Sequence, residues 1–341
     1  MAAVGAGASP PAATFGPLAL SSMWAQRFDD PDDLRPFFDA GRAMGFERFE
    51  LSHTHSPAAL ASIPSDVVIA SIHHPCPAGP PLRPGDDATS PDPAARARWT
   101  DALRRTIDTA QRLGASAICA HLGSAHDEAV RKLWFELHSR YQAGQKGSPR
   151  YVEALSELRD RLAVVQPAAI ERAVAVLTRV VGDLRGAGVA LGIETGYHGW
   201  ELPTAGGMGA LLADIDAAMP GAVVGGADCD GARLTGTADT VPVVGAWLDT
   251  GHVGVQANVG TATFDEWFDA VARVGGRWGG MHWHDVVGVR DHLPPGMGRL
   301  DLTSIGRSLA AGGRHAMAWT LEVDWYMSPD EVVRGAQTVS G

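Results

Sequence analysis

The chain is poor in cysteine, with only Cys76, Cys119 and Cys229 in 341 residues. Three thiols so far apart in the sequence indicate neither a disulfide framework nor a CxxC metal or redox motif. Free thiols of this kind are typical of a reducing compartment. We therefore expect a cytoplasmic protein.

Long apolar runs are also missing. The first residues, 1–17, are rich in Ala, Gly and Pro but have neither a basic stretch nor a continuous apolar stretch, and no later run approaches the roughly 20 apolar residues of a membrane span. We expect no export signal and no membrane segment. Residues 1–16 are interpreted as a loose N-terminal segment, and residues 17–335 as one folded domain.

Basic residues are outnumbered, with 28 Lys and Arg against 39 Asp and Glu, which gives a formal net charge of -11. Nucleic-acid binding depends on Lys and Arg that neutralise phosphates, so this balance opposes a nucleic-acid partner. Hydrophobic residues make up 45% of the chain and charged residues 20%, a composition that can bury a large core. A small-molecule substrate fits this chain best, and a homo-oligomer is left open.

Short apolar runs alternate with longer segments of helical period, which is typical of repeated βα units around a parallel sheet. Eight such units predict a single (β/α)8 TIM barrel, an architecture that commonly fills a chain of this length. The expected strands are 18–22, 48–52, 67–73, 117–121, 190–194, 244–249, 279–284 and 319–323.

Two connections are longer than a minimal barrel needs, and we interpret them as enlarged loops after strands 4 and 5 that decorate the rim. Residues 125–185 contain two stretches of helical spacing, 131–141 and 151–164, separated by a Gly-Ser-Pro break at 147–149. Residues 221–242 are rich in Gly and Asp and are interpreted as a mobile loop.

Six of the expected strands end abruptly in a metal-binding residue type. In a barrel these ends meet at the carboxyl mouth, where active sites lie. A single such residue is more often a hydrogen-bonded rim residue, but six converging ones are hard to explain structurally. Imidazoles mixed with carboxylates suit Zn, Mn or Fe better than Mg. The six residues are His73, His121, Glu194, Asp249, His282 and Glu322.

Two short motifs refine this set. Asp249-Thr-Gly-His252 places a second imidazole where a turn could bring it back to the aspartate. His282 and His284 share one face if the strand continues to the second of them, because side chains alternate along a strand. We expect His282 rather than His284 to be the ligand, since strand ends often curl.

The chain resembles the xylose-isomerase-like superfamily, which contains sugar and sugar-phosphate isomerases and epimerases together with endonuclease IV type apurinic endonucleases. The resemblance runs from about the third strand to Glu322. It implies that the catalytic metal is bound by Glu194 in Gly-Ile-Glu-Thr, Asp249 in Leu-Asp-Thr-Gly-His, His282 in His-x-x-Asp and Glu322 in Leu-Glu-Val. The segment 290–301 is similar to the family's loop after the seventh strand.

The endonuclease branch of this family binds further metal ions, and the resemblance implies one to three ions per chain here. Candidate additional ligands are His73, His121, His252, Asp291 and His292. Asp291 and His292 are adjacent, whereas one residue separates their counterparts in the nucleases, and the basic loops that hold DNA have no obvious equivalent. Both departures oppose a role in DNA repair.

The resemblance implies an isomerase or epimerase acting on a sugar, a sugar phosphate or a related hydroxy-ketone through a metal-stabilised enediolate, with Glu194 and Glu322 transferring the proton. We expect substrate contacts from His252, Arg290 and Trp283. The alternative is a multinuclear hydrolase of a phosphoester, not acting on DNA. A third alternative, a barrel without catalytic activity that only binds a ligand, is disfavoured because all the expected metal-binding residues are present.

Overall fold

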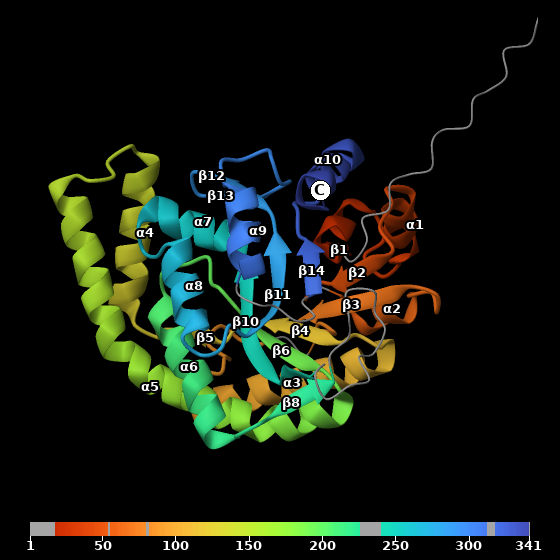
Figure 1. Ribbon diagram of the computed structural model, residues 1–341, viewed down its shortest axis with the longest axis horizontal. Helices are drawn as coiled ribbons and strands as arrows, with labels where there is room; N and C mark the ends of the chain where they lie inside the picture. The colour runs from red at the N-terminus through yellow and green to blue at the C-terminus, as the bar shows by residue number, and fades with distance from the viewer. Residues whose placement is uncertain (1–17, 54, 80–81, 226–239, 312–317, 341) are drawn as a thin grey trace, which may run out of the picture.

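Eight parallel strands close into a barrel in the computed structural model, which describes residues 18–53, 55–79, 82–225, 240–311 and 318–340 (Figure 1). The predicted TIM barrel is thereby confirmed. Each strand pairs in parallel with its neighbours, in the order β1-β14-β11-β10-β6-β4-β3-β2. The expected loose segment 1–16 and Cys229 lie outside the described residues. The strands are β1 (Leu18–Ser21), β2 (Arg48–Leu51), β3 (Val68–His73), β4 (Ala117–Ala120), β6 (Ala190–Glu194), β10 (Val244–Asp249), β11 (Trp278–Trp283) and β14 (Ala318–Leu321).

Helices surround the barrel, and several of them begin at side-chain caps. Asp92 accepts a hydrogen bond from the Ala94 amide at the start of α3, and Gly114 ends that helix with a left-handed backbone that leads into β4. The surrounding helices include η1 (Ser22–Arg27), α1 (Arg35–Ala43), α2 (Pro57–Ala61), α3 (Pro93–Leu113), α6 (Ala205–Ala218), α7 (Thr250–Val259), α8 (Phe264–Ala272), α9 (Leu302–Ala311) and α10 (Pro329–Ser340).

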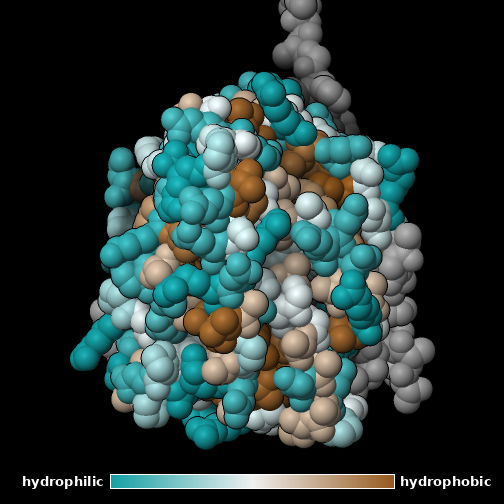
Figure 2. All heavy atoms as spheres, turned by 90° about the vertical axis from the view of Figure 1, so that its left-hand side faces the viewer, coloured by the Kyte–Doolittle hydropathy of each residue, from teal (hydrophilic) through white to brown (hydrophobic). Residues whose placement is uncertain are grey.

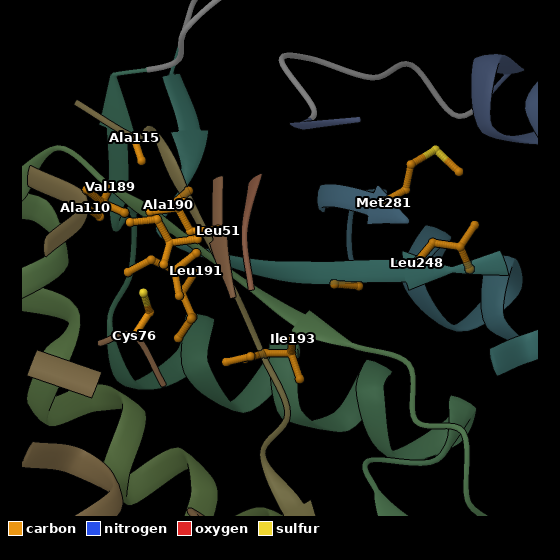
Figure 3. Packing of buried hydrophobic residues seen from close by; sticks show 14 of the residues in the cluster. Leu51, Cys76, Ala110, Ala115, Val189, Ala190, Leu191, Ile193, Leu248 and Met281 are labelled. Atoms are coloured by element: carbon orange, nitrogen blue, oxygen red, sulfur yellow. The ribbon is translucent and has the colours of Figure 1, made fainter. Parts of the chain in front are cut away.

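The hydrophobic core lies between strands and helices, and its side chains alternate with the candidate site residues. Ile193, Leu248 and Met281 are fully buried in this core (Figure 3). Each directly precedes a candidate ligand in the sequence. Because successive side chains of a strand point to opposite faces, packing these three outward turns the following residue toward the barrel axis. The core therefore orients the site.

The long connection after β4 forms two helices, α4 (Glu128–Gln142) and α5 (Pro149–Ala187). The predicted break at 147–149 is confirmed, but α5 does not end near residue 164: it continues through Pro167 for 39 residues. Its first half packs with α4 in a separate hydrophobic cluster, whereas its second half packs against the barrel (Figure 1). A single helix, α5, thus packs against both α4 and the barrel.

The second long connection lies at the opposite end of the barrel from the one that the sequence predicts. Its described ends form an antiparallel pair, β8 (Val223–Gly225) with β9 (Thr240–Pro242), which leads directly into the amino end of β10. The described pair therefore lies opposite the mouth, as the position of β8 in Figure 1 shows. The segment expected to be mobile, 226–239, lies outside the described residues.

Two other antiparallel pairs follow barrel strands at the mouth. They are β5 (Gly123–Ser124) with β7 (Glu201–Leu202), and β12 (Asp285–Val287) with β13 (Arg290–Leu293). The second pair carries three polar candidate residues at the mouth: Arg290, Asp291 and His292.

The outer surface over α4 and α5 contains both hydrophobic and hydrophilic side chains. Figure 2 shows the side of the molecule on which α4 and α5 lie, where hydrophobic patches are separated by hydrophilic side chains. Phe135 on α4 and Val152 and Val164 on α5 are exposed. None of the helices in the described part of the chain is long and apolar enough to cross a membrane.

Candidate metal centre

Four of the predicted ligands converge at the carboxyl mouth. Ligand atoms of all four lie within 4.8 Å of one another, and every one of the residues is buried. They come from the ends of three strands and from the residue just after a fourth, so the barrel itself brings them together. The four are Glu194 on β6, Asp249 on β10, His282 on β11 and Glu322 after β14.

The imidazole of His282 lies at the centre of this group. Its Nδ1 is 2.8 Å from Oε1 of Glu194, 3.1 Å from Oε2 of Glu322 and 3.5 Å from Oδ2 of Asp249. Burial would lower the pKa of His282, but the surrounding carboxylates, Glu322 foremost, raise it well above its usual value. Burial would raise the pKa of Glu194, yet the neighbouring His121 and His282 hold it well below the usual range.

The donor set fits a divalent metal ion. Among the described residues, no Lys or Arg lies within 4.0 Å of the three carboxylates. Buried carboxylates require a cation, which a metal ion or the protonated imidazoles around them, such as His282 and His121, can supply. Three carboxylates with one imidazole are ligand types suited to Zn or Mn.

Asp249 is fixed by its surroundings. It caps the N-terminus of α7, where Oδ1 accepts a hydrogen bond from the His252 amide at 2.7 Å. His284 Nε2 lies 2.7 Å from the same oxygen, and His284 Nδ1 accepts from the His292 amide at 2.7 Å. Nε2 must therefore be the donor to Asp249. The lone pair of His284 is thus used by a backbone amide, whereas Nδ1 of His282 faces only carboxylates, which supports His282 rather than His284 as the ligand.

The second oxygen of Glu194 faces imidazoles. His73 Nε2 lies 3.1 Å and His121 Nε2 3.0 Å from Oε2, and the three residues form another group of potential ligands. Burial would lower the pKa of His121, but the charge of Glu194 raises it to about 9. Glu194 thus joins two groups, one through each carboxylate oxygen.

The remaining candidate ligands lie on α7 and β13. His252 Nε2 is 3.7 Å from Oδ2 of Asp291, while its Nδ1 is 2.9 Å from the Thr195 carbonyl oxygen. His292 has a positive φ of 53°, and its Nε2 lies 3.7 Å from Oε2 of Glu322. This left-handed backbone turns two adjacent residues toward one centre, which an ordinary strand does not do.

Two predicted substrate-binding residues are placed differently. Trp283 points to the helix-facing side of β11, buried in the hydrophobic core with its ring 6.1 Å from that of Trp319, so alternation along the strand carries it away from the site. Arg290 is exposed, and its Nη2 donates a hydrogen bond to Tyr326 Oη at 2.9 Å. The prediction for Trp283 is corrected, whereas Arg290 stays a candidate at the rim.

Three features of the site do not follow from the sequence patterns. Glu50 on β2 is fully buried with both oxygens near His282 Nε2, and His53 places its ring 5.2 Å from that of His73. Trp247 fills the barrel below His282, where a Cβ on Gly280 would lie less than 3.0 Å from its ring. The role of Glu50 could have been suspected from the sequence, because it is a carboxylate inside the otherwise apolar strand Phe49-Glu50-Leu51.

The chain is similar to a known protein family in sequence and to known proteins in fold. The sequence model of the xylose isomerase-like TIM barrel matches residues 38–338. No curated protein matches the chain in sequence.

Several solved structures are similar along nearly the whole chain. L-ribulose 3-epimerase is 18% identical, with a TM-score of 0.60 over 94% of this chain and 91% of that chain. D-allulose 3-epimerase from Methylomonas sp. is 15% identical, with a TM-score of 0.59 over 94% and 95%. The IOLI protein with a bound zinc atom is 11% identical, with a TM-score of 0.59 over 95% and 96%. At identities this low, these similarities establish the fold.

Proposed function

Because the chain belongs to the xylose isomerase-like TIM barrel family, we propose that it is a metal-dependent isomerase or epimerase of a sugar or related hydroxy-ketone. The observation that carries this proposal is the convergence of Glu194, Asp249, His282 and Glu322. Two of the similar structures are sugar 3-epimerases, and a third holds zinc, which supports the same reaction class.

The chemistry requires removal of a proton from a carbon next to a carbonyl group. A divalent ion bound by the four residues would polarise the carbonyl and stabilise the enediolate. Glu194 and Glu322 belong to different strands, β6 and the end of β14, and we assign them the proton transfers as general base and general acid. Asp249, held by the His252 amide and by His284, would keep its position during the reaction.

The substrate is best interpreted as uncharged. The described surroundings of the four residues are carboxylates and imidazoles, and a phosphate would add negative charge beside three carboxylates. His252 and Arg290 are the candidates for contacts to substrate hydroxyl groups. His252 is the nearer to the cluster, with Nδ1 3.7 Å from Asp249 Oδ2.

Solvent exchange tests the proposal before the substrate is identified. Protein treated with a chelator and reloaded with Mn²⁺ or Zn²⁺ would be incubated with ketoses in ²H₂O, beginning with D-fructose and D-allulose. We expect deuterium at the carbon beside the carbonyl and conversion between epimers or isomers. Failure of the metal-loaded protein to exchange any ketose proton would overturn the proposal.

One observation favours a second candidate, a multinuclear hydrolase of a phosphoester. Glu194 presents Oε1 to His282 and Oε2 to His73 and His121, so one residue could contribute to two metal sites. His252, Asp291 and His292 could hold a further ion. The excess of acidic residues continues to disfavour DNA as the substrate.

Metal stoichiometry separates the two candidates. Elemental analysis of protein purified without chelator would be compared for the wild type, His121→Ala and His292→Ala. One ion per chain that survives both substitutions supports the isomerase. Two or three ions, reduced by either substitution, together with hydrolysis of a phosphoester, support the hydrolase.

A further inference from the structure

Glu50 is a buried carboxylate whose side chain points into the barrel. It lies on β2 where the register with β3 shifts between Phe49 and Glu50. Phe49 packs against Phe37 and Phe38 of α1, on the helix side of the strand. Alternation along the strand therefore turns Glu50 inward, where it is 0% exposed.

The partners of Glu50 are two hydroxyl groups and one imidazole. Ser71 Oγ donates to Oε2 at 2.7 Å, and Thr320 Oγ1 donates to the same oxygen at 3.2 Å. Among the described residues, no Lys or Arg lies within 4.0 Å of it, and its ion-pair partner is His282. Nε2 of His282 is 3.0 Å from Oε1 and 3.2 Å from Oε2 of Glu50.

This contact determines which nitrogen of His282 carries the hydrogen. Two hydroxyl groups already donate to Glu50, so this carboxylate is the acceptor and Nε2 is the donor, and in the neutral ring Nδ1 then holds the lone pair. Nδ1 is the atom that faces Glu194, Asp249 and Glu322. A lone pair facing three carboxylates is favourable only when a cation lies between them.

We propose that Glu50 is a positioning residue of the metal centre. Its carboxylate holds His282 through Nε2–H, selects the tautomer with the lone pair on Nδ1, and makes Nδ1 a stronger donor to the metal. A carboxylate behind a metal-binding histidine commonly changes metal affinity by roughly 10–100-fold. The inference rests on the metal site of the proposed function and adds to it a residue that touches neither metal nor substrate.

Metal binding by Glu50→Gln tests the proposal directly. The substitution keeps the size of the side chain and removes its charge. Competition between the protein and a chelating indicator, with Zn²⁺ or Mn²⁺ alone, should show about 10–100-fold weaker binding than in the wild type. Ser71→Ala is the matched control, because it removes a partner of the same carboxylate and leaves the contact with His282 intact. It should weaken binding less.

Thermal melting separates a positioning role from a purely structural one. Each protein is compared with its own metal-free form. The rise in melting temperature on adding metal should shrink in Glu50→Gln, since stabilisation by a ligand follows its affinity. An equal rise in both proteins, whatever the metal-free melting temperatures, would overturn the proposal.

The tautomer is measurable in the wild type, so the test does not depend on a variant that folds. NMR of ¹⁵N-histidine-labelled protein with Zn²⁺, assigned with His282→Asn, should show the proton on Nε2 and zinc on Nδ1. The reverse assignment would overturn the proposal. A wild type that binds neither metal overturns this inference and the proposed function together. Metal binding that is equal in wild type and Glu50→Gln overturns only the role of Glu50.

Discussion

The two oxygens of Glu194 face different surroundings. Oε1 belongs to a carboxylate side, with Asp249, Glu322 and Nδ1 of His282, and Oε2 belongs to an imidazole side, with His73 and His121. On the carboxylate side three carboxylates meet, and the neighbouring imidazoles are His282 and, beside Glu322, His292. On the imidazole side, His121 is partly exposed and supplies a positive charge by itself, since the charge of Glu194 raises its pKa to about 9. From this difference we infer that a metal ion would bind first on the carboxylate side.

Replacing Glu194 should affect both sides at once. In Glu194→Gln the metal loses a ligand and the reaction loses a general acid or base, so turnover should fall by about 10²–10⁴-fold and bound metal should decrease. Deuterium exchange and elemental analysis measure the two effects. Unchanged metal content with turnover near the wild-type value would show that Glu194 neither binds the metal nor transfers a proton.

Gly280→Ala should disturb the carboxylate side alone. The added Cβ would lie less than 3.0 Å from the Trp247 ring, and this ring packs against His282 at 5.1 Å between centroids. Overpacking of this kind costs about 1–3 kcal/mol. We expect a lower melting temperature and weaker metal binding.

Gly182→Ala is the control for that substitution. Gly182 lies in α5, where an added Cβ would have nothing within 4 Å, so alanine there should stabilise the helix by up to about 1 kcal/mol. Equal melting temperatures for the two alanine variants would contradict the close packing of Trp247.

The pH dependence of the metal-free protein should reveal the imidazole side. The folded pKa of His121, about 9, lies above its ordinary value of 6.5, so its contribution to stability is complete below pH 6.5 and is lost as pH rises through about 9. His282 acts in the same direction, because its pKa is raised as well. Melting temperatures of chelator-treated protein should fall over this range, and less steeply in His121→Asn. A flat profile would contradict protonated imidazoles at the site.

His121→Ala should have the smallest effect on catalysis if the carboxylate side holds the catalytic ion. Metal bound by Asp249, His282 and Glu322 would remain, and turnover should change only a few-fold, roughly the scale of one lost hydrogen bond. Steady-state kinetics with a metal assay measure this. A loss comparable to that of Glu194→Gln would make the two sides one functional unit and favour the multinuclear hydrolase.

The barrel and the converging residues could be predicted from the sequence because both depend on local alternation. Apolar runs of four to six residues give the strands, and a polar residue at the end of a run gives the mouth. Ile193-Glu194 and Leu248-Asp249 are examples in which the outward residue is visibly apolar and the following one is not.

The failures arose where distant parts of the chain decide. Glu50 lies within its strand rather than at its end, and its role depends on His282, which is 232 residues away. Trp283 is the exception, because local alternation alone turns the residue after a ligand outward, and the prediction relied on proximity in the sequence instead. The continuation of α5 through Pro167 depends on packing on both sides of the residue, which overrides the local preference to end a helix before proline.

Trp247 also determines from which end of the barrel a substrate can approach the carboxylates. Its indole, fully buried, occupies the barrel axis two residues below Asp249 on the same strand, between Gly192 and Gly280. This indole therefore closes the barrel below the carboxylates, and we expect a substrate to reach them from the carboxyl mouth alone.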